Sequence, residues 1–255
     1  MFNIIYAEFV KLKKSYILVI TLMGGLLMPA IQFWGKVIDK EYYTGIPKEV
    51  RESFLQGYIG NIEIMSFHFT YSIIFSLIAG YIVSREFTDK TTNVLYSYPI
   101  DRIKILIGKF IVICILVLLV YIVQFISSYL GIYIVWKELP LAEFIRTDIK
   151  INIYSALLQF ILLPIPILIA SITKNIIFPI VYGVLGALAG MVLLLVMTKN
   201  SIEAQFCPLA LPVLPFYHYN MGDPIDFIIV IGVGVITFGL FTFLCIYQCR
   251  NLDIS

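Results

Sequence analysis

The residue types that usually perform enzymatic chemistry are sparse in this sequence. His68 and His218 are the only histidines. The acid nearest to His68 is Glu63, five positions earlier, which on a helix lies roughly 140° away around the axis. No G-x-x-x-x-G-K-[ST] motif occurs, nor a G-x-G-x-x-G between a strand and a helix, so no nucleotide site is recognisable. We expect no catalytic residue, no metal site and no cofactor held by this chain.

A few polar residues interrupt long apolar segments, where contact with lipid would be costly. His68, Gln124 and Gln159 are therefore expected to face other helices or a cavity. Hydrogen bonding between helices is one interpretation, and a substrate path is the other. Glu63 and Asp226 lie close to the outer ends of such segments, where we expect water to solvate them.

The most distinctive polar pattern lies between two apolar runs. An acid is followed by threonine, leucine, proline and arginine, and a Gly-Lys pair comes just after them: Glu86, Thr91, Leu95, Pro99, Arg102 and Gly108–Lys109. Arg85 and Phe87 flank the acid.

The elements around these residues are six apolar runs, each long enough to cross a hydrocarbon core of about 30 Å. Hydrophobic residues make up 60% of the chain and charged residues 13%. Both values exclude an ordinary soluble domain. The sequence predicts an all-α, polytopic membrane protein in which residues 1–255 form a single domain. The predicted spans are 15–35, 62–84, 105–135, 151–173, 176–198 and 225–247.

The segments outside the spans have their own patterns. Apolar residues at helical spacing between Phe2 and Leu12 predict an N-terminal amphipathic helix in the membrane interface. Residues 36–61 are expected to be an outer loop, with one or two helical turns at 48–56. The apolar but proline-rich stretch 199–224 predicts a partly re-entrant outer segment between the last two spans.

Two further patterns concern the spans themselves. Pro164 and Pro166 should break or kink the fourth span. Gly183, Gly186 and Gly190 place small residues along the fifth span, which permits close helix approach within the chain or between subunits.

Loop charges predict the orientation. Three lysines precede the first span, and five basic residues lie in or beside the short connection between the second and third spans. The positive-inside rule then places both termini in the cytoplasm of a multi-pass plasma-membrane protein.

The pattern from Glu86 to Arg102 resembles the cytoplasmic loop of ABC-2-type transporter permeases. In that family an acid is followed by glycine, threonine, a leucine pair, proline and a basic residue before the third span. Lys90 replaces the usual glycine here, and only Leu95 of the leucine pair is clear. The predicted amphipathic helix, six spans and re-entrant segment also agree with this family.

The resemblance implies a mechanism. Such permeases pair with a second, identical or related permease, and each binds a cytoplasmic ABC ATPase subunit that holds ATP and Mg²⁺. The inner connection would be the coupling segment, and no nucleic-acid partner is expected. The residues that this resemblance assigns to coupling are Arg85, Glu86, Phe87, Thr91, Leu95, Pro99 and Arg102.

Within the family, the chain resembles permeases of bacitracin and lantibiotic resistance, which implies export of an antimicrobial peptide or another amphipathic compound. Three alternatives remain open. The cargo could instead be a lipid, a polysaccharide or an ion. The chain could be a membrane-embedded immunity or scaffold protein that binds a toxin without transport. An intramembrane enzyme is disfavoured by the missing catalytic residues.

Overall fold

The computed structural model describes residues 2–13, 15–38, 47–89, 91, 101–197 and 201–251. All regular structure in these ranges is helical. In chain order the elements are α1 (Phe2–Lys13), α2 (Ile17–Ile38), α4 (Lys48–Met65), the π-helix η1 (Ser66–Thr70), α5 (Tyr71–Thr88), α7 (Arg102–Trp136), α8 (Ala142–Leu162), α9 (Pro164–Thr173), α10 (Ile177–Met197), α11 (Ser201–Ala204), the 3₁₀-helix η2 (Pro208–Val213), α12 (Leu214–Met221) and α13 (Phe227–Arg250).

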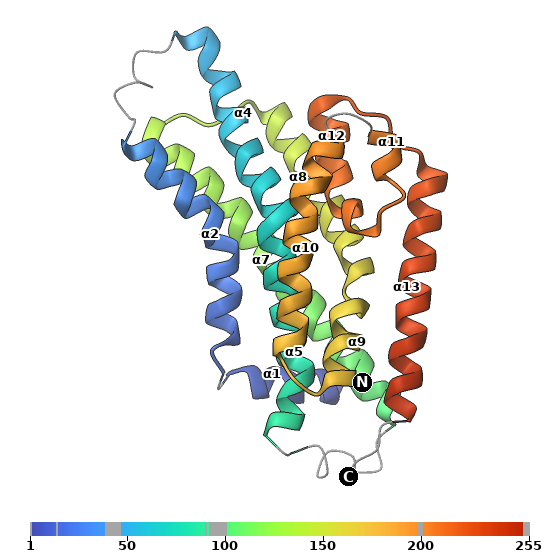
Figure 1. Cartoon of the computed structure of the whole chain (residues 1–255). Coiled ribbons are helices and arrows are strands. Elements are labelled where there is room, and N and C mark those ends of the chain that lie inside the picture. The colour runs from blue at the N-terminus through green and yellow to red at the C-terminus, as the bar shows by residue number, and fades with distance from the viewer. Residues whose placement is uncertain are drawn as a thin grey trace.

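Among the described residues, six continuous helical stretches are long and apolar enough to cross a membrane. This confirms the predicted all-α fold with six spans. They stand side by side as a bundle, with α1 lying across one end and α12 at the other (Figure 1). We call these the α1 end and the α12 end. The single-domain assignment for residues 1–255 stays a prediction.

The second span differs most from the prediction. The helical turns expected at 48–56 are present, but they begin an 18-residue helix that runs through η1 into α5. The prediction of an outer loop up to residue 61 is therefore wrong for this part of the chain. The reason is an apolar stripe of Leu55, Tyr58, Ile59 and Ile62, all 5% exposed or less, at helical spacing. Charged residues on the opposite face hid this stripe from a hydropathy argument.

The π-helix η1 interrupts this long helix near its middle. The backbone N–H of Tyr71 donates to the carbonyl of Ser66, five residues earlier, so the turn holds one residue more than an α-turn. Ser66, Phe67, His68 and Thr70 are all buried there.

Proline breaks the fourth span where the sequence predicted. α8 ends at Leu162 and α9 begins at Pro164, because neither Pro164 nor Pro166 has an N–H to continue the helical ladder. α8 also begins nine residues before the predicted boundary of 151, at Ala142, since its first turns extend past the apolar run.

α1 is a separate helix and not an extension of the first span. Leu12 is buried, and Ile5 and Phe9 pack against the core, whereas Tyr6 is exposed although it belongs to the predicted apolar stripe. α1 contacts α7, where Gly108 leaves room for the side chain of Ile4. The location of α1 in a membrane interface stays a prediction.

The proline-rich segment is folded into the α12 end rather than left as a free loop. From Ala210 to Tyr217 every residue is buried. The side chain of Gln205, itself 0% exposed, donates to the carbonyl of Pro224 at 2.8 Å and accepts from the N–H of Asp226 at 2.8 Å. Such bonds supply hydrogen-bond partners to backbone groups that lie outside the helices and have no partner from a helical ladder.

The glycines of α10 pack against α5 and η1 within this one chain. Gly190 contacts the backbone of His68. A Cβ on Gly183 would lie 2.8 Å from the carbonyl oxygen of Ser72 and 2.9 Å from the Cβ of Ser76. The close helix approach predicted for this strip is therefore confirmed as an intrachain contact.

We predict that Gly183→Ala destabilises the protein by about 1–3 kcal/mol, because the added methyl group pushes α10 away from the backbone of α5. Gly239→Ala is the matched control, since nothing lies within 4 Å of its Cβ position on α13. That control should be neutral or slightly stabilising. Thermal unfolding in detergent micelles measures both variants, and equal melting temperatures would contradict the packing argument.

Candidate functional site

The candidate site lies at the α1 end, where the ends of α1, α5, α7 and α13 meet (Figure 1). α5 enters this end and α7 leaves it, so the connection between them starts and finishes here. All five coupling residues that the structure describes, Arg85, Glu86, Phe87, Thr91 and Arg102, lie at this end. Leu95 and Pro99 lie outside the described residues.

Glu86 is the centre of a buried ion network. Its Oε2 lies 2.7 Å from Nζ of Lys109 on α7, and its Oε1 lies 2.9 Å from Nζ of Lys11 on α1. Lys11 also pairs with Glu8 at 2.5 Å. Glu86 is 5% exposed and Lys109 is 4% exposed. One carboxylate thus joins α5 to both α1 and α7.

Lys109 needs this arrangement because it lies inside an apolar helix. Its ammonium group donates a further hydrogen bond to the carbonyl of Ile82 at 3.2 Å. A buried ammonium group that lost its carboxylate would leave an uncompensated charge, which is costly. The pair therefore fixes how the end of α5 sits against the first turns of α7.

Arg85, the neighbour of Glu86, also binds α1. Its Nη1 donates to the carbonyl of Lys11 at 2.9 Å, and its Nε donates to Asp89 at 3.1 Å. The carbonyls in the last turn of a helix have no partner within that helix, and a cation there is favourable. Arg85 thus caps α1 at the carbonyl of Lys11, while Glu86 pairs with the side chain of Lys11.

Other contacts connect the same end to α13 and to the α9–α10 turn. Nη1 of Arg102 donates to the carbonyl of Arg250 at 3.4 Å, and Sγ of Cys249 lies 3.6 Å from the carbonyl of Arg102. The ammonium group of Lys174 lies 5.8 Å from the ring centre of Phe87. Four helices, α1, α5, α7 and α13, and the α9–α10 turn therefore meet at the two ends of one connection.

The predicted coupling residues differ in exposure. Glu86 is buried and faces the bundle, whereas Thr91 is exposed and its N–H donates to the carbonyl of Glu86 at 3.0 Å. Arg85, Phe87 and Arg102 are half-buried. A protein that approached this end would meet Thr91, while Glu86 would act through the helices it joins.

Sequence reasoning missed Lys11 and Lys109 as members of this site. Lys11 is 75 residues from Glu86 along the chain, and no local spacing reveals such a pairing. A signal for Lys109 was present, because a lysine inside an apolar run requires a partner.

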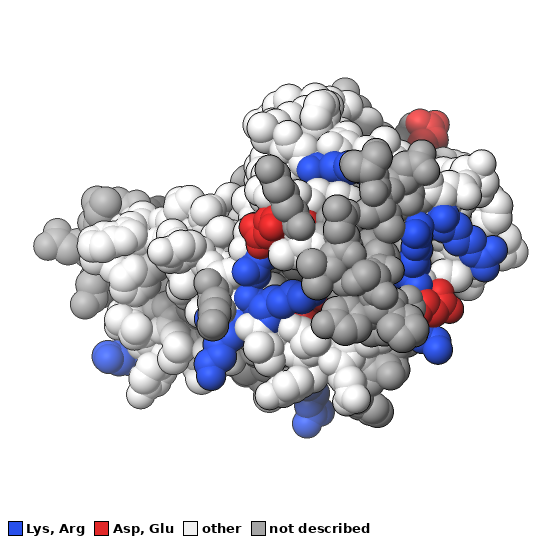
Figure 2. Space-filling view, turned by 90° about the horizontal axis from the view of Figure 1, so that it is seen from below, with Lys and Arg blue, Asp and Glu red and all other residues white. Residues whose placement is uncertain are grey.

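The α1 end is also the basic end of the molecule. Figure 2 views it directly and shows lysine and arginine side chains spread over it with few acidic ones. The exposed basic residues at this end include Lys13, Lys104, Lys174 and Arg250.

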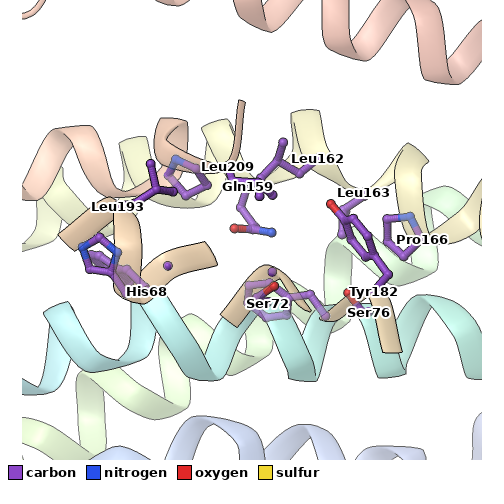
Figure 3. A pocket seen from close by; sticks show the side chains of 15 residues that line it. His68, Ser72, Ser76, Gln159, Leu162, Leu163, Pro166, Tyr182, Leu193 and Leu209 are labelled. Carbon is purple, nitrogen blue, oxygen red and sulfur yellow. The ribbon is translucent and has the colours of Figure 1, made fainter. Parts of the chain in front are cut away.

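The three residues predicted to form a substrate path are not all together. His68 and Gln159 line one cavity of about 30 Å³, space for one or two water molecules, with Gln159 reaching in from α8 (Figure 3). Nε2 of His68 lies 3.3 Å from the hydroxyl of Tyr217. Gln124 is not in the lining; its side-chain oxygen accepts a hydrogen bond from Tyr71 at 2.5 Å.

The prediction for the two acids near outer ends is half right. Asp226 is exposed and caps α13 by accepting from the N–H of Ile228 at 2.9 Å. Glu63 is 2% exposed, so the prediction that bulk water solvates it is wrong. Continuation of its helix to Lys48 places Glu63 well inside the bundle.

Within the described ranges, no group of three or more His, Cys, Asp or Glu side chains could hold a metal ion.

Residues 4–190, well over half of the 255, match the family model for the ABC-2 family transporter protein. The chain belongs to the ABC-2 transporter family. No curated protein matches it closely enough to count as a relative. The family membership confirms the coarse resemblance seen in the Glu86–Arg102 pattern and makes this ABC-2 protein a multi-pass membrane protein.

Membership also decides the question of enzymatic activity. ABC-2 permeases lack ATPase activity of their own and typically work with an ATPase subunit. This ABC-2 permease is accordingly not an enzyme.

We predict that Glu86→Gln destabilises the permease by about 3–5 kcal/mol, because it leaves the buried ammonium group of Lys109 without its carboxylate. Lys109→Met should cost less, because Lys11 still pairs with Glu86. The double variant should cost less than the sum of the two single variants, since it removes both charges. Chemical unfolding in mixed micelles measures this cycle.

The control is the exposed pair of Arg51 and Glu138, whose side chains approach to 2.8 Å. Glu138→Gln should cost at most about 1 kcal/mol. Strictly additive losses in the Glu86–Lys109 cycle would show that the two charges do not depend on each other.

The network also predicts a dependence on alkaline pH. Burial alone lowers the pKa of Lys11, but its hydrogen bonds and charge interactions with Glu8 and Glu86 outweigh burial and raise that pKa above its ordinary value of 10.5. The stabilisation is therefore complete below the unfolded pKa and is lost as pH rises through the higher folded pKa. Unfolding temperatures should fall over this alkaline range less steeply in Lys11→Met than in Lys13→Met, an exposed neighbour. Equal slopes would exclude the proposed charge pairing.

Proposed function

We propose that this chain is the transmembrane permease of an ATP-driven exporter and that its α1 end faces the cytosol. The exposed basic residues at that end support this orientation, because cytoplasmic segments of membrane proteins carry the excess of lysine and arginine. Both ends of the chain are cytoplasmic in this arrangement.

The ATPase subunit docks at the α1 end and acts on the connection between α5 and α7. The observation that carries this proposal is the ion network of Glu86, Lys109 and Lys11. Because that network joins the end of α5 to α7 and α1, a force on the connection moves these helices together instead of bending a loop. Rigid-body motion of this kind is a common way to switch a transporter between two states.

The cargo in this proposal is an antimicrobial peptide or another amphipathic, lipid-like compound. Two apolar hollows at the helix surface support that class. One, of about 360 Å³, lies between α7 and α8 and includes Ile122, Ile126 and Ile153, and the other, of about 170 Å³, lies between α7, α9 and α13. The polar cavity at His68 holds only water-sized molecules, so in this state it is closed to such a cargo.

A second permease, identical or related, completes the transporter. The exposed apolar faces of α2, α10 and α13 provide the area for it and for lipid. The residues that expose more than half of their side chain on α13 include Ile228, Ile231, Val235, Ile236 and Phe243.

We predict that a cysteine at Thr91 crosslinks to the ATPase subunit, whereas a cysteine at Leu139 does not. Both positions are exposed, and they lie at opposite ends of the bundle. The four native cysteines are replaced beforehand, because Cys114, Cys207, Cys245 and Cys249 are all free thiols.

An impermeant thiol reagent gives the matching test of orientation. In intact cells it should label Leu139→Cys and leave Thr91→Cys unlabelled until the membrane is opened. If intact cells instead label Thr91→Cys and leave Leu139→Cys unlabelled, the proposed orientation is reversed. If an ATPase co-purifies but the cells gain no export of any peptide, the proposed cargo is wrong and the permease function stands. If no ATPase partner is found, the non-transporting immunity protein is favoured instead.

A further inference from the structure

Two carboxyl groups are buried together between α4 and α8. Glu63 on α4 is 2% exposed, and Asp148 on α8 is 1% exposed. One amide nitrogen, Nδ2 of Asn152, lies within hydrogen-bond distance of an oxygen of each carboxyl group, so the two groups are close together. Neither takes part in the ion network at the α1 end.

The neighbours of the pair are polar donors without charge. Nδ2 of Asn152 lies 2.7 Å from Oε1 of Glu63, 3.0 Å from Oδ1 of Asp148 and 3.0 Å from the backbone carbonyl oxygen of Asp148, so its two N–H groups are shared among three acceptors. The hydroxyl of Tyr129 donates to Oδ2 of Asp148 at 2.6 Å. Three of the four carboxyl oxygens are thus satisfied by named donors.

The fourth oxygen is not. Oε2 of Glu63 is buried and has no hydrogen-bond partner, and the same is true of Oδ1 of Asn152. The side chain that Glu63 can reach is the carboxyl of Asp148, which is itself an acceptor. A hydrogen atom is therefore missing between two acceptors, in a place that bulk water does not reach.

The surrounding charges do not compensate the pair. The titratable side chains that interact with Glu63 are Tyr71 on α5 and Tyr121 and Tyr129 on α7, besides Asp148. Among the described residues, no lysine or arginine forms an ion pair with either carboxyl. Two ionised carboxylates in contact and away from water would be prohibitively costly, so at least one positive charge must be bound.

We propose that Glu63 and Asp148 form a proton-binding site that holds a single dissociable proton between the two carboxyl groups. The protonated Oε2 of Glu63 donates to Asp148, which supplies the missing hydrogen bond and leaves one net negative charge for Asn152 and Tyr129 to stabilise. Because the site is made by α4 and α8 together, movement of these helices apart would admit water and release the proton. Bringing them together again would bind one.

This inference does not depend on the cargo or on the ATPase. It is tested by infrared spectroscopy of the purified full chain in lipid bilayers at neutral pH. Protonated carboxyl groups have a carbonyl stretching band distinct from that of carboxylates, and the band shifts in heavy water. We expect the band in the unmodified protein and its loss in Glu63→Gln, where the amide replaces the donating O–H and leaves Asp148 ionised.

Glu143→Gln is the matched control, because Glu143 is an exposed acid in the first turn of the same helix as Asp148. It should keep the band. Absence of the band from the unmodified protein would overturn the proposal, and so would its persistence in a folded Glu63→Gln variant. Loss of the band on addition of sodium or potassium ions at constant pH would reassign the site to a metal cation.

Discussion

A charge inside an apolar bundle must have a partner, and the arrangement of the α1 end follows from this constraint. Glu86 is buried because Lys109 and Lys11 compensate it, and each lysine is tolerated there because of Glu86. The pairing determines where α1 lies, how α5 ends and where α7 begins. Replacement of the network by apolar residues could give an equally stable bundle, since buried ion pairs contribute little net stability. What they provide is a defined geometry at the point where a partner protein is proposed to act.

The same constraint has a second solution in the other half of the bundle. Glu63 and Asp148 lie where no described cation reaches them. The amide of Asn152 and the hydroxyl of Tyr129 donate hydrogen bonds to them instead. The two polar clusters therefore have different chemistry: the α1 end uses fixed opposite charges, and the Glu63–Asp148 site inside the bundle depends on a proton. The tyrosines around the second site, at positions 71, 121 and 129, add hydrogen-bonding capacity without charge.

The fold could be predicted well where hydropathy decides it. A long apolar run has to become a helix in lipid because its backbone must satisfy itself, so six spans followed from composition and length. The break at Pro164 was predicted for a similarly local reason. The full length of α4 and the first turns of α8 were missed because charged residues lower the hydropathy there, and only packing against α7 and its neighbours shows that these turns belong to the bundle.

The site was predicted less completely, and the reason is sequence distance. Glu86, Arg85 and Arg102 could be singled out because they lie within one short segment with a recognisable order. Lys11 and Lys109 complete the network from other helices, and Asp148 meets Glu63 across 85 positions. Such meetings depend on how helices rotate about their axes, which the order of residues along one helix does not give.

That rotation is fixed partly by the π-helix from Ser66 to Thr70. Its additional residue rotates the side chains of α5, which follow it in the chain, by about 100° around the helix axis relative to an uninterrupted α-helix. Glu86 is 16 residues beyond Thr70, or about 24 Å along the axis. Were this wide turn to tighten by one residue, the carboxylate of Glu86 would rotate away from Lys109. A local change in winding beside His68 would therefore break the ion network at the α1 end.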